Sequence, residues 1–469
     1  MANINLKIDH IEVSVPEGTT ILAAAKTAGI RIPTLCAYEG MGPHASCRLC
    51  IVSVAGEEKE KLACAVKAAD GMDVITDSEE LFEKRKAALT EMFRQHTVDC
   101  HHCARVGGSR IEDLDPKICE NCFYCDCQRE GFCELQALAR EFGISQLPFE
   151  PHGNDFEKDE STGTILRDPN KCIKCRRCVD VCKNNQLVGV LGMVKTPNGQ
   201  TVGVTGGSAL AESGCIRCGR CVDVCPTGAV YLKEYKDELP YYAHRQGVKT
   251  AVLMDESVLP ELSGLYGGSI SMEQLASALR KIGVDRVYAA EELRRSVAAD
   301  VERKVNEWGG AFPVIAAVDP AAKKYLEKNP PENGGNVICA DTAQKRFAEV
   351  TKGQFDKVFR ISGRNSLADE VQGTSCADYF YNARELFRIL KRTGADPLRL
   401  PGSELDSLGI REEDSPWNAA LGCAQWQIGG EPKLIEVGEG ENTVLTAVCG
   451  NPFQLKKAME TAKVVLLNA

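Results

Sequence analysis

The chain has 469 residues, carries 56 basic against 66 acidic side chains, and has a formal net charge of -10 at pH 7. Its length accommodates roughly three or four domains, and its acidic balance argues against nucleic-acid binding, which needs a basic patch to neutralise phosphates. No apolar run approaches the roughly 20 residues that span a bilayer, and the N-terminus lacks a signal-peptide pattern. We therefore expect a cytoplasmic protein with no nucleic-acid partner and no membrane partner.

Cysteines are concentrated in the first half of the chain, where nineteen of the 23 lie within the first 225 residues. The chain is too long for a small disulfide-rich secreted domain, and the cysteine spacings fit metal binding. We therefore examine these residues in chain order as candidate ligands of iron–sulfur clusters or of zinc.

The first domain, residues 1–78, is predicted to be a β-grasp ferredoxin domain. Asn3–Val15 alternates as two strands around a turn, Thr20–Gly29 reads as a short helix ended by glycine, and Ile51–Leu62 reads as a hairpin. Four thiolates in loops around these elements suit one 2Fe–2S cluster, although the first gap is longer than in plant-type ferredoxins. Free cysteines in a core are the alternative. The four candidate ligands are Cys36, Cys47, Cys50 and Cys64.

The second domain, residues 79–150, begins with the predicted helix Glu79–Gln95, which leads into His96. Cys100 and Cys103 follow, and a Cys-Glu-Leu-Gln segment begins after 29 further residues. These motifs, with the preceding domain, resemble the N-terminal part of the large NADH-dehydrogenase iron–sulfur subunit and of iron-iron hydrogenases. In those families a similar motif with a shorter gap binds a 4Fe–4S cluster through one imidazole and three thiolates. The resemblance implies that role for His96, Cys100, Cys103 and Cys133, with His101 and His102 as adjacent alternatives.

An insertion within this domain, residues 104–132, carries four more cysteines that fall within nine residues. Bare surface thiols would oxidise, so we expect them to bind metal. They could hold a fourth 4Fe–4S cluster or one tetrahedral zinc ion, or one of them could displace His96 or Cys133 from its cluster. The four residues are Cys119, Cys122, Cys125 and Cys127.

The third domain, residues 151–242, contains two matching cysteine runs, the second of which is followed by Pro226. Three cysteines at two-residue gaps wrap one cuboidal 4Fe–4S cluster, and the fourth is carried by a short helix to the other cluster. This pattern predicts a bacterial-type two-cluster ferredoxin domain, and it makes zinc an improbable alternative. Cluster one is predicted to take Cys172, Cys175, Cys178 and Cys225, and cluster two Cys215, Cys218, Cys221 and Cys182. The glycine-rich segment 203–207 between the runs is predicted to be a turn rather than a phosphate loop.

The fourth domain, residues 243–469, has only scattered cysteines and alternates apolar runs with amphipathic helices. We expect an α/β domain with a mostly parallel sheet covered by helices. It contains no nucleotide-binding fingerprint. The predicted strands are Thr250–Met254, Phe312–Val318, Lys357–Ile361 and Thr443–Val448, and the predicted helices are Ser271–Ile282, Glu291–Trp308, Ala343–Thr351, Ala383–Thr393 and Pro452–Ala462.

The fold class is therefore α+β multidomain, and the order of modules resembles the catalytic subunit of multimeric iron-iron hydrogenases. That family anchors its active-site cluster on four cysteines in the C-terminal domain. The corresponding segments here, Val314–Val318 and Val358–Arg364, have no cysteine, and Thr374-Ser375-Cys376 lies in the wrong place. We therefore expect a degenerate hydrogenase-like domain without catalytic residues.

The expected function is electron transfer within an oxidoreductase complex. The cofactors would be one 2Fe–2S cluster, three 4Fe–4S clusters, and a further cluster or zinc in the insertion. The resemblance implies a flavin- and NADH-binding subunit and a small 2Fe–2S subunit as partners, in an electron-bifurcating complex that exchanges electrons with ferredoxin. A second module could be an NADPH-binding flavoprotein or a formate dehydrogenase. The alternatives are a subunit of a respiratory NADH:quinone oxidoreductase and an active iron-iron hydrogenase.

Overall fold

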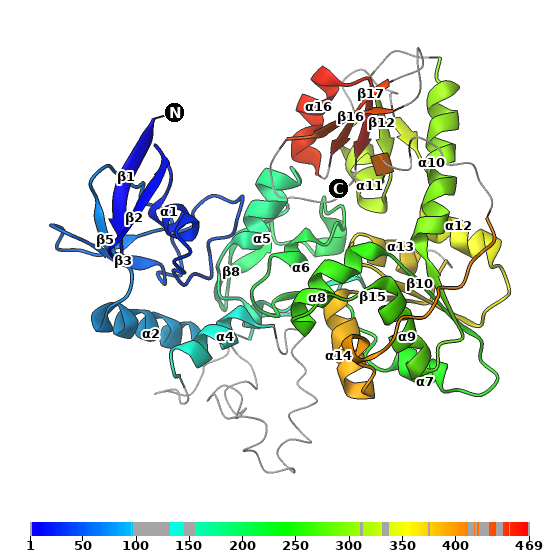
Figure 1. Ribbon diagram of the computed structural model, residues 1–469, viewed down its shortest axis with the longest axis horizontal. Helices are drawn as coiled ribbons and strands as arrows, with labels where there is room; N and C mark the ends of the chain where they lie inside the picture. The colour runs from blue at the N-terminus through cyan, green and yellow to red at the C-terminus, as the bar shows by residue number, and fades with distance from the viewer. Residues whose placement is uncertain are drawn as a thin grey trace, which may run out of the picture.

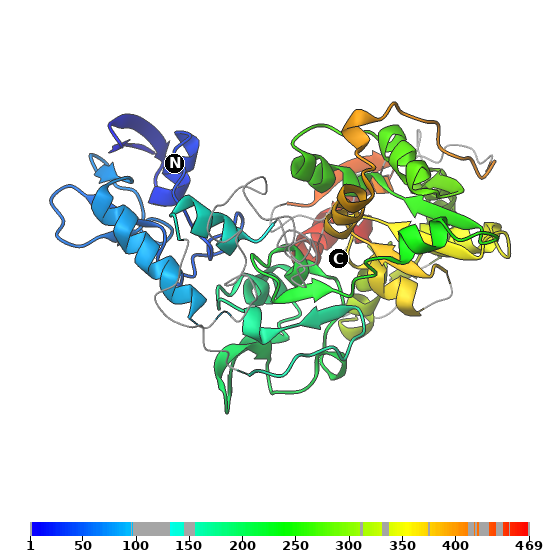
Figure 2. The same ribbon diagram turned by 90° about the horizontal axis from the view of Figure 1, so that it is seen from below.

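A computed structural model describes residues 2–94, 96, 132–144, 155–309, 313–330, 337–373, 376–410, 417, 420–421, 431–437, 444–449 and 451–467. Six predicted ligands lie outside these residues, namely Cys100, Cys103, Cys119, Cys122, Cys125 and Cys127. The N-terminal sheet stands at one end of the molecule, the cysteine-rich central part follows, and the C-terminal half forms the other end (Figures 1 and 2). Across the described residues, no helix combines the length and apolar character needed to cross a membrane.

The N-terminal domain is a mixed five-stranded sheet, in the order β2-β1-β5-β3-β4, with one helix packed on it. β1 pairs antiparallel with β2 and parallel with β5. Alternating side chains such as Leu6 and Ile8 are buried, which is the period-2 pattern of a sheet with one covered face. The elements are β1 (Asn3–Ile8), β2 (Ile11–Pro16), α1 (Ile21–Thr27), β3 (Ile51–Val54), β4 (Lys61–Leu62) and β5 (Asp73–Ile75).

Two helices connect this sheet to the centre of the molecule, α2 (Glu79–Phe93) and α4 (Glu134–Glu141). The Ser78 side chain accepts a hydrogen bond from the Leu81 amide and so caps α2. The rings of Phe82 and Phe142 stack with centroids 4.9 Å apart, which packs the two helices together.

The central ferredoxin-like part is built from short elements around its cysteines. β6 pairs antiparallel with β9, and β7 with β8 form a hairpin between the two cysteine runs. Beyond β8, Gly206 and Gly207 have φ of +92° and +79°, so the glycine-rich segment ends in a turn as predicted. The elements are β6 (Ile165–Arg167), η3 (Pro169–Lys171), α5 (Arg177–Asp180), η4 (Val181–Asn185), β7 (Leu191–Thr196), β8 (Gly199–Val204), η5 (Leu210–Glu212), α6 (Arg220–Asp223) and β9 (Val230–Leu232).

The C-terminal half contains two sheets, where the sequence predicted one. The first is parallel, in the order β11-β10-β14-β15. The second, in the order β13-β12-β18-β17-β16, is parallel except for β16. The strands are β10 (Thr250–Met254), β11 (Arg286–Ala289), β12 (Val314–Ala317), β13 (Val337–Cys339), β14 (Lys357–Ile361), β15 (Tyr379–Tyr381), β16 (Lys433–Val437), β17 (Val444–Cys449) and β18 (Val464–Leu467).

The helices of this half cover both sheets. Each predicted helix is observed within a few residues of its expected bounds, and α14 keeps both of them. The helices are α7 (Glu238–Ala243), η6 (Glu256–Val258), α8 (Leu259–Tyr266), α9 (Met272–Ile282), α10 (Ala290–Asn306), α11 (Pro320–Lys328), α12 (Ala343–Val350), α13 (Leu367–Gly373), α14 (Ala383–Thr393), η7 (Pro397–Arg399), η9 (Pro452–Gln454) and α16 (Leu455–Thr461).

Candidate iron–sulfur sites

The N-terminal domain brings its four cysteines together in one buried place. The exposed fractions of Cys36, Cys47, Cys50 and Cys64 are 0%, 4%, 1% and 4%. The Cys36 sulfur accepts hydrogen bonds from the thiols of Cys47 and Cys64, which lowers the pKa of Cys36. The Leu35 amide donates to the Cys47 sulfur at 3.5 Å. Four adjacent sulfurs with a backbone donor suit a small anionic cluster.

The structure describes two of the four residues predicted to hold the histidine-ligated cluster. His96 follows the end of α2, is 4% exposed, and lies edge-on to the Phe93 ring with centroids 6.2 Å apart. Cys133 lies directly before α4. Both helices lead toward the central part, so these two residues lie at the junction between the first and third domains (Figure 1).

One cavity in the central part is lined by three cysteines of the first run and the last cysteine of the second run, namely Cys172, Cys175, Cys178 and Cys225. About 410 Å³ of this space contains no protein atoms, part of it open to solvent. Burial raises the pKa of the Cys178 thiol well above its ordinary value. Metal binding at such thiols releases their protons.

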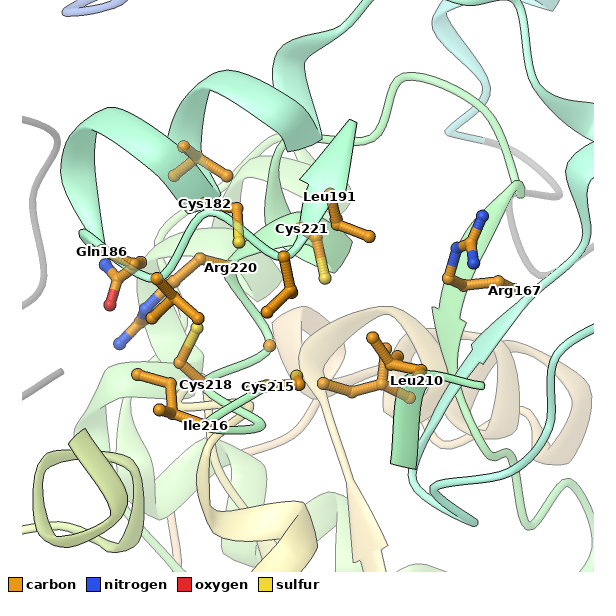
Figure 3. A pocket seen from close by; sticks show the side chains of 15 residues that line it. Arg167, Cys182, Gln186, Leu191, Leu210, Cys215, Ile216, Cys218, Arg220 and Cys221 are labelled. Atoms are coloured by element: carbon orange, nitrogen blue, oxygen red, sulfur yellow. The ribbon is translucent and has the colours of Figure 1, made fainter. Parts of the chain in front are cut away.

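A second cavity has the reciprocal lining, Cys215, Cys218, Cys221 and Cys182. Figure 3 shows these four side chains arranged around one space, with Arg167 and Arg220 at its sides. Burial also raises the pKa of the Cys221 thiol well above its ordinary value. The fold thus brings together the two crossed sets of cysteines that the spacing predicted.

The two runs reach this arrangement through matching turns. Lys174 and Arg176 in the first run, and Arg217 and Gly219 in the second, all have φ between +56° and +77°. These left-handed residues curl the backbone so that the Lys174 amide donates to the Cys172 sulfur at 3.4 Å. The Arg217 amide donates to the Cys215 sulfur at the same distance. Inward-facing amides favour a negatively charged cluster, so the donor set of each cavity fits a cuboidal 4Fe–4S cluster.

Continuous apolar packing connects the cysteine sites along the molecule. One core contains Cys36 and Cys47 of the first site, Cys175 of the first cavity and, partly buried, Cys133. A second core contains cysteines from both cavities of the central part. A third core joins Ile216 and Cys218 of the second cavity to β12, β17 and β18. Each site therefore shares a packed core with the next one.

A polar contact that the sequence did not predict joins α4 to the first cavity. Both guanidinium nitrogens of Arg177 donate to the Glu134 carboxylate, at 2.8 and 2.9 Å, and Arg177 is 3% exposed. The Glu134 amide also donates to the Pro226 carbonyl at 3.0 Å. The available signal was a repeat, since Arg177 and Arg220 precede the third cysteine of each run.

Comparisons with known families agree with this arrangement. Residues 1–79 match the family described as "2Fe-2S iron-sulfur cluster binding domain". Residues 171–229 match the "4Fe-4S dicluster domain", and residues 255–424 match the "Iron only hydrogenase large subunit, C-terminal domain". The chain is a hydrogenase-like iron–sulfur subunit. It is an electron-transferring component of an oxidoreductase.

Among the relatives of this hydrogenase-like protein is the "NADP-reducing hydrogenase subunit HndD" of Solidesulfovibrio fructosivorans, 29% identical over 90% of this chain and 73% of that protein. A G-type component of the NADH-quinone oxidoreductase of Rhizobium meliloti (strain 1021) is 32% identical over 43% of this chain, but the match covers only 21% of that protein. A crystal structure of an NAD+-reducing nickel–iron hydrogenase in the H2-reduced state is 28% identical, covers 50% of this chain and 89% of that chain, and has a TM-score of 0.41.

In the hydrogenase-like domain of this protein, the two segments without cysteine are closed by other groups. All four residues of β12 have an exposed fraction of 0%. A side chain at Gly363 would overlap the carbonyl oxygen of Ser257. Next to it, Arg360 pairs with Asp255, and both are buried. Although burial opposes ionisation, Arg360 and Arg364 hold the pKa of the Asp255 carboxyl below its usual range. An ion pair and packed backbone thus occupy this region.

Proposed function

We propose that the chain is the iron–sulfur electron-transfer subunit of a cytoplasmic, NAD(H)-dependent, flavin-based electron-bifurcating complex, with no hydrogenase activity of its own. The observation that carries the proposal is the series of cysteine sites connected by shared apolar cores. Single electrons need closely spaced carriers, and cluster potentials can be tuned over a range of roughly -700 to +450 mV. The chain would conduct electrons between a flavin and distant acceptors.

The proposed cofactors follow the cysteine sites. A β-grasp domain over residues 1–78 holds one 2Fe–2S cluster, and a domain over 79–150 holds a 4Fe–4S cluster on His96, Cys100, Cys103 and Cys133. A neutral imidazole in place of a thiolate raises the potential of that cluster. The two cavities of residues 151–242 hold two further 4Fe–4S clusters on their crossed sets. The insertion 104–132 holds an additional 4Fe–4S cluster or a zinc ion on Cys119, Cys122, Cys125 and Cys127.

The proposed partners are a flavin- and NADH-binding subunit, a small 2Fe–2S subunit and ferredoxin. A second module, an NADPH-binding flavoprotein or a formate dehydrogenase, would dock on the domain over residues 243–469. The relative HndD is named as a subunit of an NADP-reducing hydrogenase, and it matches most of this chain, which supports a place in a pyridine-nucleotide-linked complex.

The absence of hydrogenase activity rests on the closed hydrogenase-like site. A cluster needs thiolate anchors, yet the strand Val314–Ala317 is fully buried without a thiol. Gly363 has no room for a side chain, because the Ser257 backbone fills that place. Hydrogen evolution by the isolated complex with a low-potential dye would overturn this part of the proposal.

A respiratory NADH:quinone oxidoreductase is the second candidate. The identity of 32% to the Rhizobium meliloti protein, over 43% of this chain, favours it. The hydrogenase-family match over residues 255–424 favours the first candidate, because it extends through most of the C-terminal half. Recovery of the native complex from membranes, with quinone-dependent NADH oxidation, would favour the second candidate.

Purification of the native complex under anaerobic conditions tests the proposal. The subunits would be identified by mass spectrometry, and iron and zinc would be measured per chain. We expect about fourteen iron atoms, from one 2Fe–2S and three 4Fe–4S clusters, or about eighteen if the insertion holds another. NADH should reduce the clusters only when a flavin-containing partner is present. About two or four iron atoms per chain would overturn the proposal.

A further inference from the structure

Arg167, the last residue of β6, lines both cysteine cavities of the central part. Among the residues that line the two cavities, it is the one that they share. It is 6% exposed, so its charge is poorly screened by solvent. A buried cation between two cluster sites acts on both of them at once.

The surrounding structure fixes this guanidinium in place. The backbone of Arg167 pairs with β9 on one side and exchanges two hydrogen bonds of 2.9 Å with Asp159 on the other. One guanidinium nitrogen donates to the Val202 carbonyl. The Asp159 carboxylate lies 3.7 Å from another guanidinium nitrogen and also accepts from the Leu210 amide at 2.9 Å. The countercharge is therefore partly occupied elsewhere.

The effect of Arg167 on the sulfur atoms has a definite sign. In the first cavity its charge favours the thiolate forms of Cys172 and Cys178. A cluster becomes more negative when it takes up an electron, so the same charge favours the reduced cluster. In the second cavity, Arg167 and Arg220 both belong to the lining (Figure 3).

We propose that Arg167 is a shared positive charge that raises the reduction potentials of both ferredoxin clusters together. Each cluster takes up and passes on one electron, and Arg167 neither gains nor loses a proton. A shared charge shifts the two potentials in parallel, so the step between the clusters stays small while both stay reducible. The inference rests on the proposed function, because it requires both clusters to be present.

Redox titration of the full-length chain, followed by EPR spectroscopy, tests this proposal. Arg167→Gln should lower both midpoint potentials, by about 59 mV for each tenfold change in the one-electron equilibrium. Arg167→Lys keeps the charge and should stay close to wild type. Arg220→Gln is the matched control, since Arg220 is 3% exposed and lines only the second cavity. It should lower one potential and leave the other in place.

A shift of one potential only in Arg167→Gln, or equal shifts in the Gln and Lys variants, would overturn the shared-charge role. If the Gln variant fails to retain iron, Asp159→Asn gives the opposite test, because removing the countercharge should raise both potentials. Unchanged potentials in that variant would refute the proposal. The iron content and EPR signals of the wild-type chain report separately on the proposed function, since they establish whether two clusters are present at all.

Discussion

The two cavities of the central part have the same cysteine geometry but different neighbours. The first meets α4, where buried Arg177 forms a two-pronged pair with Glu134. The second meets the hydrogenase-like half, where Arg217 pairs with Asp369 at 2.6 Å and the Lys328 ammonium donates to the Cys215 carbonyl at 3.2 Å. Matching turns therefore point one site toward the N-terminal modules and the other toward the C-terminal domain, which gives the conducting path a direction.

Removal of a crossing cysteine should give the largest effect and could break the comparison. Cys225→Ser should empty the first cavity although Cys225 belongs to the second run, with a loss of about four iron atoms per chain. Hydrogen exchange should then increase in α4, next to the first cavity. Cys182→Ser should give the reciprocal result, with faster exchange around residues 215–221. If Cys225→Ser instead disturbs the second cavity, the crossed assignment is wrong.

Gly219 and Arg176 occupy the same turn position in the two runs, and replacing each with alanine sharpens the comparison. A side chain at Gly219 would overlap Asn365 of the C-terminal half, and φ is +77°. Gly219→Ala should therefore destabilise the junction by roughly 2–4 kcal/mol, from backbone strain and overpacking. Arg176 already has a side chain in this conformation, and its side chain is exposed. Arg176→Ala should change stability by less than about 0.5 kcal/mol. Thermal unfolding of the iron-loaded proteins measures both, and equal effects would contradict the account.

The Arg177–Glu134 pair should contribute more than an exposed ion pair. Glu134→Gln leaves a buried guanidinium with a weaker partner and should cost roughly 1–3 kcal/mol. The measurable result is faster proteolysis of the segment around α4. Glu141→Gln removes an exposed partner of Arg31 near the same helix and serves as the control. Equal proteolysis rates in the two variants would show that the pair does not hold α4 in place.

Asp369 should give the smallest effect. It pairs with Arg217 and Lys324, whose side chains are about a third exposed. Partial exposure weakens such pairs, so Asp369→Asn should cost no more than about 1 kcal/mol. The difference from wild type should shrink as salt is added. A loss that is larger and independent of salt would place this contact on the same footing as the Arg177–Glu134 pair.

Spacing along the chain was informative wherever chemistry required a fixed local geometry. The crossed cysteine sets followed from two-residue gaps, since three thiolates must surround one face of a cluster. The helix Ala383–Thr393 followed from strong amphipathic spacing and a glycine at its end. These features depend on neighbouring residues, so the sequence contains the information directly.

Features that depend on contacts between distant segments were missed. Five strands of the C-terminal half are only three to five residues long, and the buried run Val464–Leu467 is typical of a strand too short to be separated from a helix by its pattern. The shared position of Arg167 arises because β6 and β9 bring the two runs together. The closed position at Gly363 depends on the Ser257 loop, which is more than a hundred residues away in sequence.

The core around Phe93 has a consequence for biogenesis. It combines Leu35 from the first domain, Leu135 from α4 and Cys175 from the central part in a single buried group. None of these modules can bury its apolar surface when it is separated from the others, so a nascent chain must release the later segments before the earlier ones become fully ordered. Maturation factors would therefore have to deliver iron and sulfide while the modules are still apart, and we expect truncation after residue 78 to yield an insoluble fragment.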